Sequence, residues 1–479
     1  MVSIQDGILP DKSIDFDGLV TFKNSQGVAA RGTLSHVTRH HIIFEAYNPY
    51  SIVQLSEVLS EMRLLRGERV LYSGRAVVSN IVATGLMSIV SATLVDPWSD
   101  LVGTALGGDL QKEVEQFVRD FEAVHAIRPT YQLSVTSLGS FLSELSRWLS
   151  QVEATADVAS RIKDQYAFTC EVERGLQAKL GELFTGFEQR AKEIPEEEVI
   201  SHKSFARRQL HPLMLVSPFV HRTFTKPLGY AGDYEMVNMI AREPLEGPTT
   251  YAKILNALIL RSDGAQAHRN RIDRLQVYLH NEADRVTKTD RPLRVLNIGC
   301  GPAQELQRFI RNDPLSDRCE FHLMDFNEET LAHTRRKLAE VAFESKRNPN
   351  IIYHHKSINE LLKEATRSAL GKETSPFVTA DLIYCAGLFD YLNDRICCRL
   401  LQLFYTWVSD NGLVVATNVT PLNSVRYFLE HLLEWYLIYR GPDDMSVIAP
   451  PGTGEQTIGC DATGVNVFLE IRKPKQGHS

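Results

Sequence analysis

The stretch from Leu293 to Gln304, which reads LRVLNIGCGPAQ, places the tightest constraint on how this 479-residue chain can fold. Arg294–Ile298 is a short apolar run between a proline and a glycine, which is typical of a buried parallel strand. A glycine turn over Gly299–Pro302 follows, and helical spacing resumes over Glu305–Ile310. Glycines let a ligand approach the backbone closely, and the start of a helix offers free N–H groups. The stretch predicts a nucleotide-binding edge, although a tight strand–helix turn without a ligand has the same pattern.

Four further β-like runs follow this turn in an order that suits one parallel sheet. They are Phe321–Asp325, Ile351–His355, Val378–Tyr384 and Gly412–Asn418. Asp325 ends the first of them, at a spacing from the glycines where a carboxylate can accept both ribose hydroxyls of a nucleotide. Glu305 stands about where dinucleotide folds place their third glycine, which favours a ligand without a pyrophosphate over NAD.

This ordered series resembles a class I S-adenosylmethionine-dependent methyltransferase. The resemblance implies a Rossmann-like α/β fold for residues 291–479, closed by a last, antiparallel strand over Val465–Ile471. It also implies S-adenosyl-L-methionine as the cofactor, with Gly299 and Gly301 at its methionine end and Asp325 at its ribose. The remaining cofactor-binding residues that it implies are Cys300, Phe326, Ser357, Ile358, Cys385, Ala386 and Gly387.

A segment rich in glycine and tyrosine, KPLGYAGDYEM over residues 226–236, precedes the sheet. Its composition indicates a shaped loop, and we interpret it as a cover that closes over the cofactor. Tyr230 or Asp233 would then lie against the sulfonium, because a tyrosine presents electron density to a positive charge. The alternative is a passive turn in which Asp233 is the N-cap of a helix over Tyr234–Ile240.

Three segments resemble a narrower family. KPLGYAGDYEMVNMI, GCGPAQEL and HLLEWYLIYR are similar to the bacterial enzymes of 3-hydroxypalmitic acid methyl ester biosynthesis, which are quorum-signal (quorum-sensing) methyltransferases. The likeness covers residues 200–473 and implies a small-molecule, fatty-acid-derived substrate that becomes a fatty acid methyl ester. A carboxylate is already ionised at neutral pH, so its methylation needs positioning rather than a general base.

Substrate contacts are expected from the cover and from an apolar helix predicted over Val425–Tyr439. Tyr439 joins Tyr230 and Asp233 as a candidate catalytic residue. Further candidates are His221, Arg222, Tyr391, Trp435 and Arg440, and either arginine could pair with a carboxylate. The apolar face Phe428–Leu437 could line an acyl channel or form helix core.

Residues 1–105 consist of short β-branched runs separated by turns, which predicts a small barrel or sandwich. The expected strands are Leu19–Phe22, Gly32–Leu34, His41–Glu45, Val70–Gly74, Arg75–Val82 and Met87–Leu94. The region resembles a PilZ-like domain, a six-stranded barrel whose best-known members bind cyclic di-GMP through an RxxxR pair. No such pair precedes the first strand, and Arg63 and Arg66 are expected in a loop. A degenerate barrel with a structural or protein-contacting role is therefore expected.

Two mainly helical regions connect the barrel to the sheet. Residues 106–200 form the predicted connecting region, with helices over Leu110–Val124, Leu138–Val158 and Ile162–Ile194. The predicted lid or cap region spans residues 201–290. The connecting helices are also a candidate homodimer interface.

Composition excludes several classes of protein. A net charge of −7 gives no electrostatic case for binding nucleic acid or an anionic membrane. Seven cysteines without a CxxC pair fit a reducing cytosol, and no metal site is expected. The start of the chain lacks a signal pattern, and the longest apolar run, Ile81–Val95, is too short to span a bilayer. A cytoplasmic protein without stable membrane insertion is expected.

Two other functions stay open at this stage. One is a small-molecule O- or N-methyltransferase with another acceptor, which would need a base beside its alcohol or amine. The other is a non-catalytic, cyclic di-GMP-sensing regulator with a relic methyltransferase fold. The intact glycine turn and Asp325 argue against a relic, and the missing arginine pair argues against a sensor.

Overall fold

A computed structural model describes residues 18–37, 40–46, 53–66, 69–83, 87–98, 114–115, 118, 127–155, 165–242, 244–369 and 378–475. The chain forms two compact units. The first comprises Met1–Arg119 and Leu228–Tyr230, and the second comprises Asp120–Pro227 and Ala231–Ser479. The predicted fold class is confirmed, with a closed barrel, a set of helices and an α/β sheet of Rossmann type. The finer domain boundaries stay predictions.

The first unit contains six antiparallel strands, closed into a barrel in the order β1-β2-β3-β6-β5-β4. They are β1 (Gly18–Lys23), β2 (Ala29–Val37), β3 (His41–Ala46), β4 (Val58–Arg66), β5 (Arg69–Ala83) and β6 (Ser88–Leu94). Alternate side chains point inward, so Val20, Phe22 and Phe44 are buried, and the two phenylalanine rings lie 5.4 Å apart. Strand β5 unites two of the runs that were predicted as separate strands.

Strand β4 is absent from the predicted strands, so the expectation that Arg63 and Arg66 lie in a loop is wrong. The reason is a β-bulge. The register against β5 shifts between Leu59 and Met62, and Glu61 between them has a φ of 47°. Leu59 and Met62 are both buried although they are three positions apart in the sequence. The bulge therefore hides the two-residue period by which a strand is recognised.

The second unit begins with helices that share one apolar core. They are α3 (Pro129–Ala154), α5 (Gln165–Lys192), α6 (Val199–Met214), α7 (Pro218–Thr225), α8 (Tyr234–Ala241), α9 (Thr250–Leu260) and α15 (Arg426–Leu432). Helix α3 begins earlier than predicted, because Pro129 serves as a first-turn residue, where a missing N–H costs nothing. The helix predicted over Leu110–Val124 lies outside the described residues, apart from 114–115 and 118.

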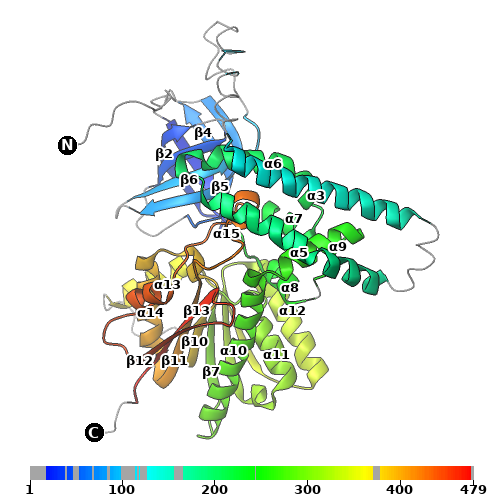
Figure 1. The fold of residues 1–479 in the computed structure, drawn as a ribbon. Coiled ribbons are helices and arrows are strands. Elements are labelled where there is room, and N and C mark those ends of the chain that lie inside the picture. The colour runs from blue at the N-terminus through cyan, green and yellow to red at the C-terminus, as the bar shows by residue number, and fades with distance from the viewer. Residues whose placement is uncertain are drawn as a thin grey trace. The chain divides into compact units, whose positions relative to one another are not determined.

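Seven strands form the sheet of the second unit, in the order β12-β13-β11-β10-β7-β8-β9. Figure 1 labels β12, β13, β11, β10 and β7 of this sheet. The parallel strands are β7 (Leu293–Ile298), β8 (Cys319–Asp325), β9 (Asn350–His355), β10 (Ala380–Cys385) and β11 (Val408–Val419), which confirms the predicted runs. Strand β13 (Asn466–Arg472) is antiparallel to β11, as predicted, but it does not end the sheet. The edge strand is β12 (Glu455–Cys460), whose polar sequence EQTIGC carries no apolar run.

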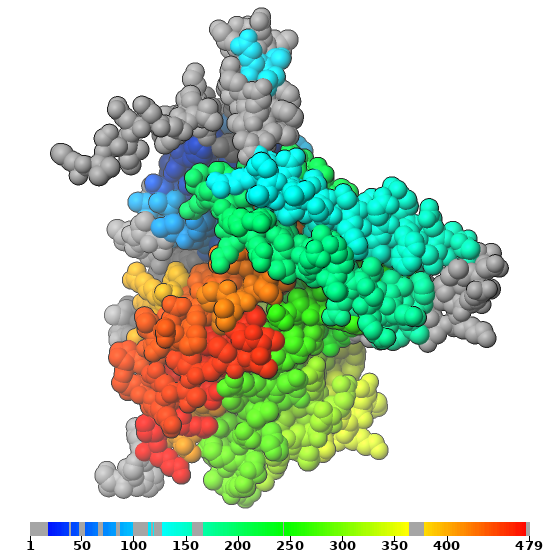
Figure 2. Space-filling model, in the orientation of Figure 1, coloured from blue at the N-terminus to red at the C-terminus, as the bar shows by residue number. Residues whose placement is uncertain are grey.

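Helices cover both faces of this sheet, which explains why its parallel strands are almost continuously apolar (Figure 1). One face carries α10 (Asp263–Thr287), α11 (Gln304–Asn312) and α12 (Glu328–Ser345); the other carries α13 (Ile358–Ala369), α14 (Asp394–Trp407) and α16 (Pro442–Ile448). In the space-filling view, the green surface of α10 adjoins the red C-terminal strands (Figure 2). Arg274 of α10 pairs there with Glu470 of β13 at 2.8 Å.

The apolar helix predicted over Val425–Tyr439 is only partly correct. Helix α15 ends at Leu432, and Trp435–Tyr439 continues without helical structure. The Trp435 N–H turns back to the Leu429 carbonyl at 3.0 Å, a bond typical of a helix that has stopped winding. Phe428–Leu433 packs in the core of the helical layer, so the helix-core reading is confirmed for this part.

Polar side chains from α6 and from the residue that follows α7 bond the carbonyls at the end of α15. Arg207, His211 and Lys226 each donate, at 2.8 Å, to the carbonyl of His431, Leu432 or Leu433 respectively. Glu434 follows in a left-handed conformation, with φ of 50°, and pairs its buried carboxylate with Arg207. These donors satisfy carbonyls that the next helical turn would have bonded. The donors are distant in the chain, so the local pattern could not indicate this end.

Arg440 links the segment after α15 to the sheet. Its side chain is 2% exposed, and all five of its N–H groups have acceptors at 2.6–2.9 Å. The acceptors are the carbonyls of Phe389 and Leu392, the side-chain oxygen of Asn418 and the carboxylate of Asp394. Arg440 is a structural residue with no donor left for a substrate carboxylate.

We predict that Arg440→Met lowers the free energy of unfolding by about 3 kcal/mol or more, because it removes a charged donor from each of three buried oxygens. Urea denaturation at pH 7 measures the loss. Asp394→Asn is the matched control: the Asp394 side chain is 71% exposed, so removing its charge should cost less than about 1 kcal/mol. Equal, small losses in both variants would contradict the structural role of Arg440.

Candidate functional site

The sheet has one position where its topology opens a crevice. Strands β7 and β10 are neighbours, but the chain leaves β7 through α11 toward β8, and it leaves β10 through α14 toward β11, on the other side. Helices that diverge in this way leave a gap above the carboxyl ends of the two strands. Ligands of open α/β sheets bind at this switch point. The predicted glycine turn follows β7, so the structure places it at the switch point.

The glycine turn has a backbone that residues with a side chain rarely adopt. Gly299 and Gly301 have φ values of 70° and 51°, and Ala303, which precedes α11, has a φ of 49°. Ala303 cannot cap the helix with a side chain, so the first N–H groups of α11 have no such acceptor. Cys300 is buried in the core beneath the turn, where burial raises the pKa of its thiol well above the ordinary value.

Asp325 ends β8 directly beside this turn. One carboxylate oxygen accepts the N–H of Gly301 at 3.1 Å, and the other accepts the N–H of Asn327 at 3.0 Å. Burial raises its pKa to about 6, although these backbone donors favour the charged form. The N–H of Phe326 also favours the charged form of this carboxylate. The two oxygens offer about four lone-pair positions in all, so Asp325 remains a preorganised acceptor for a ligand hydroxyl.

The other predicted cofactor residues lie at the carboxyl ends of the neighbouring strands. Cys385 is the last residue of β10 and is buried in the core, with Ala386 and Gly387 after it. The Gly387 N–H donates to the Thr417 hydroxyl of β11 at 3.2 Å. The structure thus brings the ends of β7, β8 and β10 together, and the cofactor contacts of these residues stay predictions.

Ser357 and Ile358 follow β9 and begin α13. The Ser357 hydroxyl and N–H both donate to the Glu360 carboxylate, at 2.9 and 2.8 Å, and the Glu360 N–H returns a bond to the hydroxyl. This is a capping box, S-x-x-E, and the spacing in the sequence could have identified it. Ile358 packs in the core, and Phe326 is half-buried after β8. Glu360 supplies an acid beside the predicted adenine contacts.

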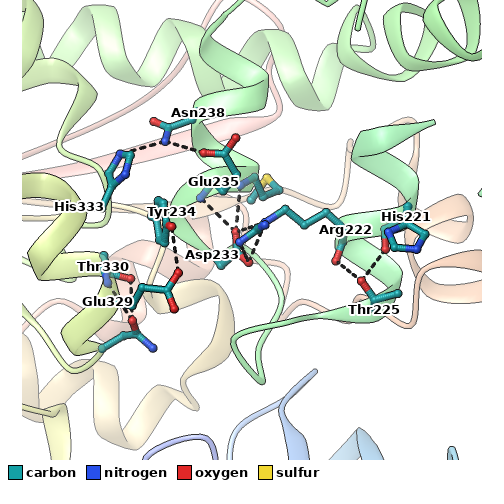
Figure 3. A network of polar contacts seen from close by, with 12 residues as sticks. His221, Arg222, Thr225, Asp233, Tyr234, Glu235, Asn238, Glu329, Thr330 and His333 are labelled. Carbon is teal, nitrogen blue, oxygen red and sulfur yellow. Dashed lines mark hydrogen bonds and ion pairs between the residues drawn. The ribbon is translucent and has the colours of Figure 1, made fainter. Parts of the chain in front are cut away.

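In the loop, Asp233 has two structural tasks (Figure 3). Its carboxylate accepts the N–H groups of Glu235 and Met236, at 3.1 and 2.9 Å, and so caps α8. It also pairs with Arg222 of α7 through contacts of 2.9–3.0 Å. Arg222 is thereby committed to a carboxylate of its own chain. His221, next to it, is exposed.

Helix α8 is joined by polar contacts to the helices that start at the strand ends (Figure 3). The Tyr234 hydroxyl donates to Glu329 of α12 at 3.0 Å. Asn238 contacts His333 of α12 at 3.2 Å and accepts from Gln304, the first residue of α11, at 2.6 Å. The sequence did not point to Asn238 or Gln304, because their partners are distant in the chain. These bonds fix the segment after the loop beside the glycine turn.

Gly232 packs closely against two aromatic candidates. A Cβ on Gly232 would lie 2.8 Å from the Tyr391 hydroxyl, and the residue has a φ of 77°, so only glycine fits without strain. The Tyr391 hydroxyl accepts the indole N–H of Trp435 at 2.9 Å. The end of the loop is therefore held against the segments that follow β10 and α15. Tyr230 belongs to the first unit, and its role stays a prediction.

Tyr439 has a buried hydroxyl that lacks a well-formed hydrogen bond among the described residues, although the Asn423 side chain lies close to it. Its neighbours in sequence place it near the strand ends, since the Ile438 N–H donates to the Asp390 carbonyl at 2.7 Å and the Arg440 N–H to that of Val419 at 3.0 Å. An orphaned buried hydroxyl costs free energy and needs an explanation, such as a bound ligand.

The described residues contain neither a metal-binding cluster nor a membrane-spanning helix. No group of three or more histidine, cysteine or acidic side chains there could hold a metal ion. None of the helices in the described ranges has the length and apolar character needed to cross a membrane.

No protein-family model matches the chain, and no curated protein matches it. Among solved structures, a possible exported protein from Bordetella parapertussis is 17% identical with a TM-score of 0.41, covering 53% of this chain and 86% of that one. The N-methyltransferase NodS from Bradyrhizobium japonicum WM9, in complex with S-adenosyl-L-homocysteine, is 14% identical with a TM-score of 0.29, covering 44% and 88%. The magnesium protoporphyrin IX methyltransferase ChlM from Synechocystis PCC 6803, with bound S-adenosyl-L-homocysteine, is 12% identical with a TM-score of 0.32, covering 45% and 86%.

We predict that Asp233→Ala lowers the free energy of unfolding by about 2 kcal/mol, because it removes both an N-cap and a buried ion pair. Asp233→Asn keeps an acceptor for the helix N–H groups and loses only the ion pair, so it should lose less. Thermal and urea denaturation of both variants measure the difference. A wild-type melting temperature in Asp233→Ala would contradict the structural assignment.

Proposed function

We propose that this protein is an S-adenosylmethionine-dependent methyltransferase that methylates the carboxylate of a fatty or 3-hydroxy fatty acid. The observation that carries the proposal is the Asp325 carboxylate, held beside the Gly299–Gly301 turn at the switch point of the sheet. A carboxylate that keeps an acceptor position at this place suits a hydroxyl of a ribose. The residues present therefore fit the cofactor.

The proposed roles follow from position. Gly299, Cys300 and Gly301 hold the methionine end through their backbone, and Asp325 binds the ribose. Around the adenine lie Phe326, Ser357 and Ile358, and below the methyl group lie Cys385, Ala386 and Gly387. When bound, the cofactor supplies an electrophilic methyl group on a sulfonium. The chain's contribution is to align an acceptor with that methyl group and to exclude water.

The fatty-acid acceptor rests on the likeness of three segments to ester-forming enzymes, described above. A carboxylate acceptor also requires no general base. The Tyr439 hydroxyl lacks a well-formed hydrogen bond among the described residues, so it is available to donate to an acceptor oxygen. The direct test is mass spectrometry of lipids from cells that express the protein. Methyl esters of 3-hydroxy fatty acids that appear only with the wild type support the acceptor, and methylated alcohols or amines would favour a different methyltransferase.

We predict that S-adenosyl-L-homocysteine binds at neutral pH and that Asp325→Ala weakens binding by about tenfold or more, because a charge-assisted acceptor is lost. Isothermal titration calorimetry measures both. Asp410→Ala is the control, since Asp410 is exposed near the amino end of β11. Undiminished binding by Asp325→Ala would overturn the ribose assignment, and no binding by wild type would overturn the proposed function.

The pKa of Asp325 also predicts the pH dependence. Because burial raises it to about 6, the carboxylate is ionised above pH 6 and becomes protonated below that value. Affinity for S-adenosyl-L-homocysteine should thus be full at pH 7.5 and fall about tenfold at pH 5, where about a tenth of the group is ionised. Asp325→Asn should bind weakly at both values and lose this dependence. If the affinity of Asp325→Asn for S-adenosyl-L-homocysteine changed with pH as much as that of wild type, the titrating group would not be Asp325.

For the loop, we predict that Tyr230→Ala lowers methyl transfer about tenfold or more while the melting temperature stays unchanged. Tyr230→Phe keeps the ring and separates its role from that of the hydroxyl. Hydrogen exchange of residues 226–236 should slow when S-adenosyl-L-homocysteine is added. Normal turnover in Tyr230→Ala, with no ligand-dependent protection, would favour the passive turn.

A further inference from the structure

Arg271 of α10 is a buried guanidinium without an anionic partner. Its side chain is 8% exposed, and its one hydrogen-bonded neighbour among the described residues is the ring of His268, 2.9 Å from Nη2 to Nδ1. Among the described residues, no carboxylate oxygen lies within 4.0 Å of the guanidinium nitrogens of Arg271. His268 is uncharged at neutral pH, because burial and the adjacent arginine lower its pKa well below the ordinary value. A neutral ring therefore takes the place that a carboxylate usually fills.

The nearest acidic groups are committed elsewhere. Glu305 and Asp390 attract Arg271 electrostatically, but neither forms an ion pair with it. Both Asn297 and Tyr384 donate to one oxygen of Glu305, at 3.0 and 2.8 Å. The backbone N–H of Val419 donates to Asp390 at 2.6 Å. Both carboxylates thus attract the guanidinium without forming an ion pair with it.

Other shielded arginines of this unit differ from Arg271. Arg207 pairs with Glu434, Arg222 with Asp233, and Arg440 with Asp394. Burying a charge is costly unless it is paired, and these three arginines follow that rule. Arg269 has no ion pair either, but it donates to the carbonyls of Ile240 and Leu260. In the described ranges Arg271 has neither a carboxylate nor a carbonyl as a hydrogen-bond acceptor, and a buried charge that the fold leaves unpaired is typical of a functional site.

Arg271 lies against the end of β10. A Cβ built on Gly387 would be 3.0 Å from both Nη1 and Nη2, so the missing side chain of Gly387 makes room for the guanidinium. Gly387 has a φ of 91°, which also favours glycine. Among the described residues, a few side-chain atoms lack both a hydrogen bond and contact with solvent, and the nitrogens of Arg271 do not belong to them. The unpaired donors of Arg271 therefore border open space. This is the end of the site where the proposed function places the methyl group.

We propose that Arg271 binds a carboxylate of a ligand at the reacting end of the site. The proposal rests on the proposed function and adds to it the residue that recognises an anion. A planar guanidinium with free N–H groups matches a carboxylate in a two-bond geometry, and no described residue of the chain fills that role. Two ligand groups share this chemistry: the amino-acid carboxylate of the cofactor and the carboxylate of the acceptor.

The test separates these sources with three ligands. S-adenosyl-L-homocysteine carries the amino-acid carboxylate, and 5′-methylthioadenosine keeps the nucleoside and sulfur but lacks it. The acceptor probe is 3-hydroxydecanoate, added to enzyme saturated with S-adenosyl-L-homocysteine. Calorimetry compares wild type, Arg271→Met and Arg271→Lys. Arg274→Met is the control, because Arg274 lies on the same helix and already pairs with Glu470.

If the cofactor supplies the carboxylate, Arg271→Met weakens S-adenosyl-L-homocysteine about tenfold to a hundredfold and leaves 5′-methylthioadenosine within about twofold. If the acceptor supplies it, both nucleosides bind normally and 3-hydroxydecanoate loses a similar factor. Arg271→Lys should lie between, because it keeps the charge but not the two-bond geometry. Equal weakening of both nucleosides, or no change with any ligand, would overturn the proposal. Failure of wild type to bind either nucleoside would instead reject the proposed function, and this proposal with it.

Stability distinguishes ligand binding from a structural role. Replacing a residue that stabilises the fold should lower the melting temperature. The Arg440→Met variant, which is predicted to lose free energy of unfolding, is an example. Arg271 is a buried charge without a partner, so Arg271→Met should melt at the wild-type temperature or above it. Added S-adenosyl-L-homocysteine should then raise the melting temperature of wild type more than that of the variant if the cofactor supplies the carboxylate. A clear fall in the melting temperature of ligand-free Arg271→Met would assign Arg271 to the fold.

Discussion

The site depends on one constraint, namely that β7 and β10 are adjacent parallel strands whose chains leave in opposite directions. Parallel strands need crossover helices, and diverging crossovers cannot cover the ends of both strands. The gap must be bordered by backbone, which explains the glycines after β7 and the Asp325 carboxylate that accepts the Gly301 N–H. Asp325 therefore joins the end of β8 to the turn after β7 and remains an acceptor for a ligand.

Buried arginines fall into two groups, which differ in whether the protein supplies hydrogen-bond acceptors for their N–H groups. Arg440 uses all five of its N–H groups, and Arg207 takes a helix-ending carbonyl and a carboxylate. In both residues the protein supplies the acceptors that a buried guanidinium requires. Arg271 has only a neutral ring, beside a glycine at the end of β10. The same residue type thus stabilises the fold in one place and marks a ligand position in another.

The segment from Gly232 to Asn238 shows how a loop can be placed by many small contacts. Asp233 caps α8 and pairs with Arg222, while Asn238 bonds to Gln304 at the start of α11. Gly232 lies against Tyr391, which is itself bonded to Trp435. Because Asp233 stabilises the fold, it would contribute to catalysis by positioning the residues beside it. Tyr230 and Tyr439 remain the candidates for direct contact with the sulfonium or the acceptor.

The sequence by itself determined the strand–turn–helix at Leu293–Gln304, the order of the parallel strands and the position of Asp325, because these depend on burial and turn chemistry over a few neighbouring residues. The tertiary structure alone decided where α15 ends, since its last carbonyls are bonded by Arg207 and His211 of α6 and by Lys226, which follows α7. It also decided that β4 is a strand, because a bulge disrupts its alternation. Which arginine is free depends on partners far along the chain: Arg222 and Arg440 have them and Arg271 does not. Pairing of this kind is a property of three-dimensional proximity, and no local pattern records it.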